Sequence, residues 1–158
     1  MTTWWRRQLE SDAPRATILV RIAIGLVFVA EGIQKFLYAD ALGAGRFAKI
    51  GIPAPEVMGP FVGIIEIVGG TLILVGLLTR LAAIPLIVDM VVAIASTKIP
   101  ILLGHGYFGF ADPSGKVGLW SMLHEARTDL AMLLCLVFVF VAGAGERSLD
   151  ALLRRRTG

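Results

Sequence analysis

The chain has 158 residues, of which 56% are hydrophobic and only 17% are charged, and its mean hydropathy is +0.79. Soluble domains carry about 45–50% apolar and about 25% charged residues, so this composition excludes an ordinary water-soluble domain and predicts an integral membrane protein. A single cysteine, Cys135, excludes an intrachain disulfide and a thiolate metal cage. Many of the basic residues lie at the two ends of the chain, which is typical of membrane proteins, and we expect no nucleic-acid partner.

The first 14 residues are expected to form an interfacial segment. They place two aromatic side chains beside two basic ones, a combination that favours the headgroup level of a membrane: Trp4, Trp5, Arg6 and Arg7. The next apolar segment runs from about residue 16 to residue 38, close to the ~20 residues that a helix needs to cross the hydrocarbon core. It is the first predicted span.

A connection rich in glycine and proline, residues 39–56, then breaks any continuous helix. The second and third predicted spans, residues 57–78 and about 81–103, are separated only by Thr79 and Arg80, so they must form an antiparallel hairpin. Residues 104–122 contain several aromatic side chains among glycines and are expected to lie against the mouth of a bundle. The fourth predicted span covers about residues 123–144.

These segments predict an all-α fold, a four-helix transmembrane bundle over residues 15–145, followed by a short basic tail, residues 146–158. If the N-terminus is cytoplasmic, nine Lys and Arg residues lie on that side of the membrane and six on the other. The positive-inside rule therefore favours both termini in the cytoplasm, as in a bacterial inner-membrane protein. In the tail, leucines on one side and arginines at the end predict a helix lying on the anionic inner leaflet.

Ionisable side chains inside the spans are the informative feature, because each costs a few kcal/mol or more at mid-bilayer unless it faces protein or water. The first span places two such residues four apart on one face, where they can pair, and the fourth begins with several more. The candidate binding residues are Glu31, Lys35, Glu66, Asp89, Glu125 and Asp129 in the spans, and His105 in the aromatic loop.

Helical spacing indicates where these side chains point. Glu66 follows Gly59 and Gly63 on a glycine stripe, where a neighbouring helix can approach closely. Asp89 lies on a similar stripe of small residues in the third span. The charged faces can therefore converge on one polar pocket, which we expect to open towards the extracytoplasmic side beneath the loop that holds His105.

Structural explanations compete with this reading. Glu31 and Lys35 can form an ion pair that closes a helix end, and Glu66 can hydrogen-bond a neighbour and fix helix register. Asp89 can satisfy backbone groups freed by Pro85. His105 can be a solvated loop residue, and Arg21 is expected to snorkel to the inner membrane surface.

Several short motifs, in this order and spacing, make the chain resemble the DoxX family of small four-helix membrane proteins, from about residue 17 to residue 150. The motifs are Arg21-Ile-Ala-Ile-Gly25, Glu31-Gly-Ile-Gln-Lys35, Gly51-Ile-Pro53, Glu66-Ile-Val-Gly-Gly70, Gly76-Leu-Leu-Thr-Arg80, Gly106-Tyr-Phe-Gly-Phe110 and Gly143-Ala-Gly-Glu-Arg-Ser-Leu-Asp150.

The resemblance implies a four-helix membrane protein linked to quinone-coupled oxidation or to redox-stress complexes. By position it implies that the polar positions of the family are Gly32, Lys35, Glu66, Arg80, Glu125 and residues 148–150. Asp89 and the residues from Arg127 to Asp129 depart from the family pattern. The family also covers members of unknown activity, so the resemblance supports the fold more strongly than the chemistry.

Two functions follow as hypotheses. The first is a site for a quinone- or lipid-like small molecule in a membrane redox system, because reducing a quinone requires protons that buried carboxylates or a desolvated lysine can deliver. Quinone is then the only cofactor expected; no covalent cofactor and no metal site are predicted, and no catalytic residue is assigned. The second is a non-catalytic scaffold or accessory subunit for a redox enzyme, or a small proton-coupled transporter. Besides the lipid bilayer, the expected partners are a soluble or membrane redox protein and a second copy of the chain.

Overall fold

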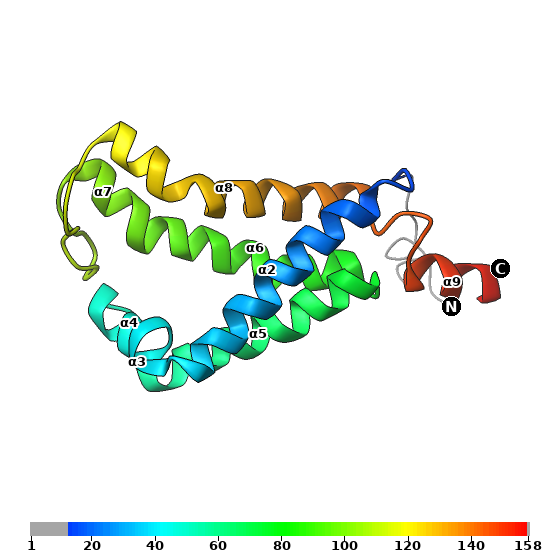
Figure 1. The fold of residues 1–158 in the computed structure, drawn as a ribbon, viewed down its shortest axis with the longest axis horizontal. Helices are drawn as coiled ribbons and strands as arrows, with labels where there is room; N and C mark the ends of the chain where they lie inside the picture. The colour runs from blue at the N-terminus through cyan, green and yellow to red at the C-terminus, as the bar shows by residue number, and fades with distance from the viewer. Residues whose placement is uncertain (1–12, 158) are drawn as a thin grey trace.

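The computed structural model describes residues 13–157, and within them every regular element is a helix. Four long helices run roughly along the long axis (Figure 1): α2 (Thr17–Leu37), α5 (Pro55–Val75), α6 (Thr79–Ala93) and α8 (Leu119–Ala142). Shorter helices lie at the two ends of this bundle: α3 (Ala39–Leu42), α4 (Ala44–Ile50), α7 (Ile99–Leu103) and α9 (Leu149–Thr157). Nearly all of the predicted interfacial segment, residues 1–14, lies outside the described residues.

Three helical segments of the described chain are long and apolar enough to cross a membrane: Thr17–Leu37, Pro55–Val75 and Thr79–Leu103. They confirm the first three predicted spans to within a few residues. The third is one continuous rod in which a π-helical turn, Ile94–Lys98, joins α6 to α7. Helix α8 covers the fourth predicted segment, but its first turns carry Glu125, Arg127 and Asp129, and by composition it does not count as a fourth span.

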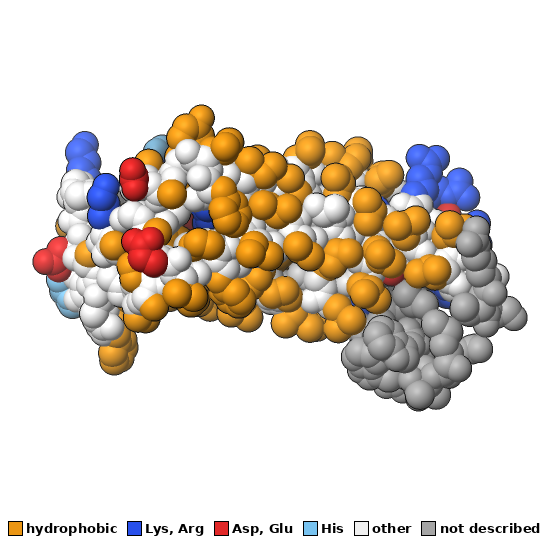
Figure 2. Space-filling model, turned by 90° about the horizontal axis from the view of Figure 1, so that it is seen from below, with side chains coloured by type: hydrophobic (Ala, Val, Ile, Leu, Met, Phe, Trp, Pro, Cys, Tyr) orange, Lys and Arg blue, Asp and Glu red, His pale blue; other side chains and the backbone are white. Residues whose placement is uncertain are grey.

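The four long helices share one apolar core, to which each contributes buried side chains such as Phe28, Ile73, Leu86 and Leu136. Other apolar side chains point outward. On the face shown in Figure 2, hydrophobic side chains cover the middle of the molecule, and charged ones gather towards its two ends. This is the surface of a protein that contacts the lipid bilayer, because in water such a large exposed apolar area would drive association.

Helices α2 and α5 pack closely because glycines line their contact. A Cβ atom added at Gly32 would lie 2.6 Å from the carbonyl oxygen of Gly63, and one added at Gly70 would lie 3.0 Å from the Cβ of Phe28. Small residues at such crossings let two backbones approach within van der Waals contact, which is how membrane helices gain packing energy. The glycine stripe predicted around Glu66 therefore contacts α2 at Gly63 and Gly70, whereas Gly59 lies against Gly43 and Ala44.

Replacing Gly32 with alanine is expected to push α2 away from α5, because the nearest obstructing atom, the carbonyl oxygen of Gly63, belongs to the backbone and cannot rotate aside. Overpacking of this kind costs about 1–3 kcal/mol, so we expect a lower midpoint of thermal unfolding for the purified protein in detergent. Ala23→Leu on the exposed face of α2 is the matched control. Equal midpoints for the two variants would contradict the packing role of Gly32.

The connection between α2 and α5, where the sequence predicted a break in any continuous helix, contains the short helices α3 and α4. The break is present, but the breaking residues act at single positions, with Gly43 between the two helices and Gly51 in the left-handed region (φ +89°) after the second. Each glycine ends a helix and leaves the residues between free to form one.

The aromatic loop between α7 and α8 packs against the open end of the bundle, as expected. Its Tyr107 hydroxyl donates to the carbonyl of Ala95 in the π-helical turn at 2.8 Å, and the N–H of Ala111 donates to the carbonyl of Ile50 at the end of α4. In Figure 1 the loop lies at the same end as α3 and α4. These contacts hold α4 and the α7–α8 loop together at this end.

At the opposite end, Arg21 of α2 is buried rather than snorkelling, with only 2% of its surface exposed. Its guanidinium donates four hydrogen bonds of 2.7–2.9 Å to carbonyl oxygens of the last turn of α5 and the segment after α8: Ile73, Leu74, Ala144 and Arg147. The prediction for Arg21 was wrong because carbonyls at or beyond helix ends lack the regular intrahelical donor, and of these four the carbonyl of Ile73 also accepts the N–H of Gly76 at 3.1 Å.

The C-terminal tail packs against the same end of the bundle, at the turn between α5 and α6. The Asp150 carboxylate accepts hydrogen bonds from the N–H groups of Leu78 (2.7 Å) and Thr79 (3.1 Å), and so it caps the start of α6. The N–H of Asp150 in turn donates to the carbonyl of Gly76. We call this arrangement of Arg21, residues 76–79 and residues 144–150 the tail clasp.

The tail is helical from Leu149 onward, as predicted, and its leucines form an exposed apolar side: Leu149, Leu152 and Leu153. Next to it, Arg15 and Glu146 form an exposed ion pair at 2.7 Å, and the nearby guanidinium lowers the pKa of the Glu146 carboxyl. Exposed pairs of this kind contribute little to stability because water and salt screen them.

Candidate functional site

A cavity of about 360 Å³ lies between the helices near the α3–α4 end, and we call it the inner chamber. Its wall is built by residues of α2, α4, α5, α6, the π-helical turn and α8. Six predicted site residues line it: Glu31, Lys35, Glu66, Asp89, Glu125 and Asp129. The structure therefore brings together charged residues that are up to 98 positions apart in the sequence.

The centre of the chamber is an ion pair between Lys35 of α2 and Glu66 of α5, whose Nζ and Oε2 atoms lie 2.6 Å apart. Both side chains are shielded, with exposed fractions of 11% and 3%. The sequence predicted that Lys35 could pair with Glu31, its neighbour on the same helix face. Lys35 pairs with Glu66 instead, because the glycine contact brings α5 against α2 at this level.

Asp89 of α6 faces the same pair. Its carboxyl lies against that of Glu66 and within electrostatic reach of Lys35. The buried Oδ2 atom of Asp89 has no hydrogen-bond partner among the described residues. Since a buried polar atom without a partner costs free energy, this oxygen is a point at which a bound molecule could supply the missing contact.

A second ion pair joins the π-helical turn to α8. The Nζ atom of Lys98 lies 3.3 Å from Oδ2 of Asp129, and both side chains are largely shielded. π-Helical turns are rare and occur often at functional sites. Here the turn places Ser96, Thr97 and Lys98 together on the cavity wall.

Apart from Arg46 and Thr128, the rest of the chamber wall is apolar. Side chains of several helices supply it, among them Phe28, Phe47, Met58, Val62 and Met132. Methionine and aromatic side chains adapt to flat or irregular apolar ligands. An apolar box that contains a few converging polar groups is the usual form of a small-molecule site, and such sites occupy about 300–1,000 Å³.

His105 does not line the chamber. It is exposed in the loop after α7, and its Nδ1 atom lies 2.8 Å from the carbonyl oxygen of Gly106. Gly104 ends α7 in the left-handed conformation (φ +82°), and the aromatic loop begins beyond it. The structure therefore does not bring His105 to the chamber, and the alternative interpretation of His105 as a solvated loop residue agrees with its exposure.

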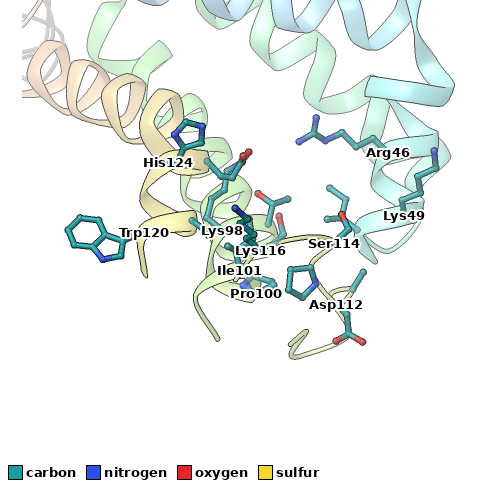
Figure 3. A pocket seen from close by; sticks show the side chains of 17 residues that line it. Arg46, Lys49, Lys98, Pro100, Ile101, Asp112, Ser114, Lys116, Trp120 and His124 are labelled. Atoms are coloured by element: carbon teal, nitrogen blue, oxygen red, sulfur yellow. The ribbon is translucent and has the colours of Figure 1, made fainter. Parts of the chain in front are cut away.

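A second, wider cavity of about 700 Å³ adjoins the chamber, and we call it the outer vestibule (Figure 3). Arg46, Ser96, Lys98 and Glu125 line both cavities. Sequence reasoning did not include Arg46 among the site residues, since it lies in the connection between the first two predicted spans. Lys98 could have been predicted as a site residue from the sequence, because it is a cation within an apolar span.

The polar positions implied by the family resemblance divide into two groups. Lys35, Glu66 and Glu125 line the inner chamber. At the other end, Asp150 belongs to the tail clasp, and Arg80 donates to the carbonyl of Val141 at 3.0 Å. The second group holds helix ends together, so its role is explained by the fold without a ligand.

Among residues 13–157, no three or more His, Cys, Asp and Glu side chains are arranged as a metal site would need. What the chamber offers is an acid/base set. Lys35 can donate hydrogen bonds, the carboxylates of Glu66 and Asp89 can accept them or exchange protons, and the apolar wall excludes bulk water. This arrangement suits a flat molecule with one or two polar edges.

Comparisons with known proteins identify the family of the chain. The DoxX family model matches residues 16–99. An uncharacterized membrane protein of Mycobacterium tuberculosis is 50% identical over 152 residues, which covers 96% of this chain and 90% of the relative. An uncharacterized protein of Haemophilus influenzae is 33% identical, covering 90% of this chain and 93% of the relative.

A Bacillus subtilis protein named "Putative oxidoreductase CatD" is 28% identical over 125 residues, covering 78% of this chain and 87% of that protein. No solved structure matches this chain.

Proposed function

The chain belongs to the DoxX family, as its motifs suggested, and from this premise we propose that its inner chamber binds a quinone- or lipid-like small molecule in a membrane redox system. The observation that carries the proposal is the Lys35–Glu66 ion pair facing Asp89 inside an apolar cavity of about 360 Å³. A bacterial relative named as an oxidoreductase lends support to the redox part.

The residues present fit a quinone. A quinone ring is flat and apolar with two carbonyl oxygens, so it needs an apolar slot and one or two hydrogen-bond donors. Lys35 can donate to one carbonyl oxygen, and the apolar side chains of Phe28, Val62 and Met90 can contact the ring. Oδ2 of Asp89 would gain the partner that it lacks when it meets a hydroxyl of the reduced form.

A quinone accepts two electrons and two protons when it is reduced to a hydroquinone. Lys35, Glu66 and Asp89 would hold and pass the protons, and their seclusion from water would keep other proton donors away. The electrons would come from a redox partner protein or a reduced substrate. The role of the chain would therefore be to bind the quinone, to orient it and to supply its protons.

We further propose that α8 is a fourth span, which makes the chain a multi-pass protein of a bacterial cytoplasmic membrane. Its exposed face carries Leu134, Phe138 and Val141, an apolar stripe like that of α5 with Phe61, Ile64 and Val68. Two of the three charged residues in its first turns, Glu125 and Asp129, lie in the chamber wall, whereas Arg127 is exposed and donates to the carbonyl of His124. Glu125 and Asp129 therefore need not meet lipid.

Both termini are proposed to lie in the cytoplasm, as the distribution of Lys and Arg favours. Several of the six basic residues at the other end line the two cavities or are paired, among them Lys35 and Lys98. The charges of Lys35 and Lys98 are balanced by carboxylates inside the bundle and do not add to the positive charge of the loops. The inner chamber and the outer vestibule then open on the extracytoplasmic side.

The test is to purify the protein from bacterial membranes into lipid nanodiscs, extract it with organic solvent, and measure quinone by mass spectrometry. We expect a near-stoichiometric quinone and saturable binding of a short-tail quinone, weakened at least tenfold by Glu66→Gln. Glu56→Gln, an exposed carboxylate on the same helix, is the control and should bind as the wild type does.

Absence of quinone from the extract together with no binding of the short-tail analogue would refute the proposal. The same affinity in the Glu66→Gln and Glu56→Gln variants would also refute it. A chain that binds no quinone but is recovered with a redox enzyme would point to the accessory role instead.

A further inference from the structure

The outer vestibule carries more positive than negative charge. Four cationic side chains line it, Arg46, Lys49, Lys98 and Lys116, against two carboxylates, Asp112 and Glu125. Of these cations, only Lys98 has an ion pair within the described part of the chain, and that pair uses Asp129 of the chamber wall. Arg46, Lys49 and Lys116 thus remain available to an anion from outside.

The carboxylates of the vestibule do not form ion pairs with these cations. Oδ1 of Asp112 accepts a hydrogen bond of 2.7 Å from the backbone N–H of Gly106, so it stabilises its own loop. Glu125 is exposed at the start of α8 and makes no ion pair with any described residue. Because the vestibule is concave and has partly apolar walls, its excess positive charge is focused on the space inside.

Hydrogen-bond donors accompany the charge. In Figure 3, Arg46 of α4 lies on one side of the hollow, and Lys98 and Lys116 lie on the other. Ser114 and Ser121 also line the vestibule, and neither hydroxyl is hydrogen-bonded within residues 13–157. A guanidinium fork, ammonium groups and hydroxyls that converge from several elements match the several acceptor oxygens of a tetrahedral oxyanion.

We propose that the outer vestibule is a binding site for a phosphate-type oxyanion, held between Arg46 and Lys116. The oxyanion can be the headgroup phosphate of a phospholipid or a free phosphate, which share this chemistry. With about 700 Å³ the vestibule is large enough for either. This site is separate from the quinone proposed for the inner chamber and does not depend on it.

The first arm of the test titrates inorganic phosphate into the full-length protein in phosphatidylcholine nanodiscs and follows binding by calorimetry. We expect saturable binding that the double variant Arg46→Gln/Lys116→Gln weakens at least tenfold. Arg155→Gln, which removes an exposed cation in the tail at the opposite end of the molecule, is the matched control and should leave the affinity unchanged.

The second arm measures phosphatidylglycerol that stays bound during native mass spectrometry of the same three proteins. Retention that the double variant alone loses, without binding of inorganic phosphate, identifies a lipid headgroup as the source. If neither probe separates the wild type from the double variant, the proposal fails. It also fails if Arg155→Gln weakens binding as much as the double variant does, because that result shows nonspecific charge attraction.

Short-tail quinone binding, measured on the same proteins, separates the two proposals. Oxyanion binding that depends on Arg46 and Lys116 in a protein that takes no quinone leaves the vestibule site intact and removes only the chamber proposal. Quinone binding in a protein that binds no oxyanion would refute only the proposal for the vestibule.

Discussion

Replacing Arg21 with methionine is expected to lower the free energy of unfolding by about 3–5 kcal/mol. The side chain of Arg21 is buried and donates four hydrogen bonds to carbonyl oxygens of two separate segments. Methionine fills a similar volume but donates nothing, so Ile73, Leu74, Ala144 and Arg147 would lose a donor at a place that water reaches poorly. The loss should appear as separation of the tail from the α5–α6 turn.

The midpoint of thermal unfolding in detergent measures this effect, and for a protein of this size we expect it to fall by roughly 10 °C. Arg21→Lys keeps the charge without the planar fork and should recover only part of the loss. Arg15→Gln removes an arginine from an exposed ion pair and should change the midpoint by little. If Arg21→Met and Arg15→Gln unfold at the same temperature, the clasp does not stabilise the fold.

Replacing Lys35 with methionine is expected to be equally damaging and to abolish binding of the short-tail quinone. The substitution leaves the carboxyls of Glu66 and Asp89 facing one another without a cation, and removing one partner of a buried pair typically costs about 3–5 kcal/mol. Thermal unfolding measures the first effect and calorimetric titration with the quinone measures the second.

The double variant Lys35→Met/Glu66→Met separates stability from binding. It removes both charges of the pair, so the bundle should regain much of its stability, because well-packed apolar side chains can replace a buried ion pair at little cost. Quinone binding should stay absent. A double variant that binds quinone as tightly as the wild type would show that the pair is purely structural, which was the alternative for Glu66.

The spans could be predicted from the sequence because hydrophobic length is a local property. Residues 57–78 and 81–103 are apolar over the distance a helix needs, and only Thr79 and Arg80 interrupt them. The observed helices begin and end within a few residues of these limits. Helices α3 and α4 were not predicted because they are too short to show hydrophobic periodicity. The glycines of this connection end the two helices and do not prevent them from forming.

The membership of the chamber followed from one rule: charged residues in apolar spans face protein or water. The rule named Glu66 and Asp89, but it could not name their partners. Lys35 pairs with Glu66 across 31 positions because of how α2 crosses α5, and that crossing is set by tertiary packing. The contacts of Arg21 and Asp150 could not be predicted for the same reason, since their partners are backbone groups of distant segments.

The tail clasp also has a consequence for the order in which the protein is made. Arg21 belongs to α2, which is translated before the other described helices, yet two of its four acceptors, Ala144 and Arg147, lie 123 and 126 residues further along the chain. Synthesis at about 5–20 residues per second separates the two by several seconds. During that interval Ile73 and Leu74 can already accept from the guanidinium, but its remaining N–H groups must be accommodated by lipid headgroups or by the insertion machinery. The contact of α2 with this end of the bundle is therefore completed only after residues 144–147 have been translated.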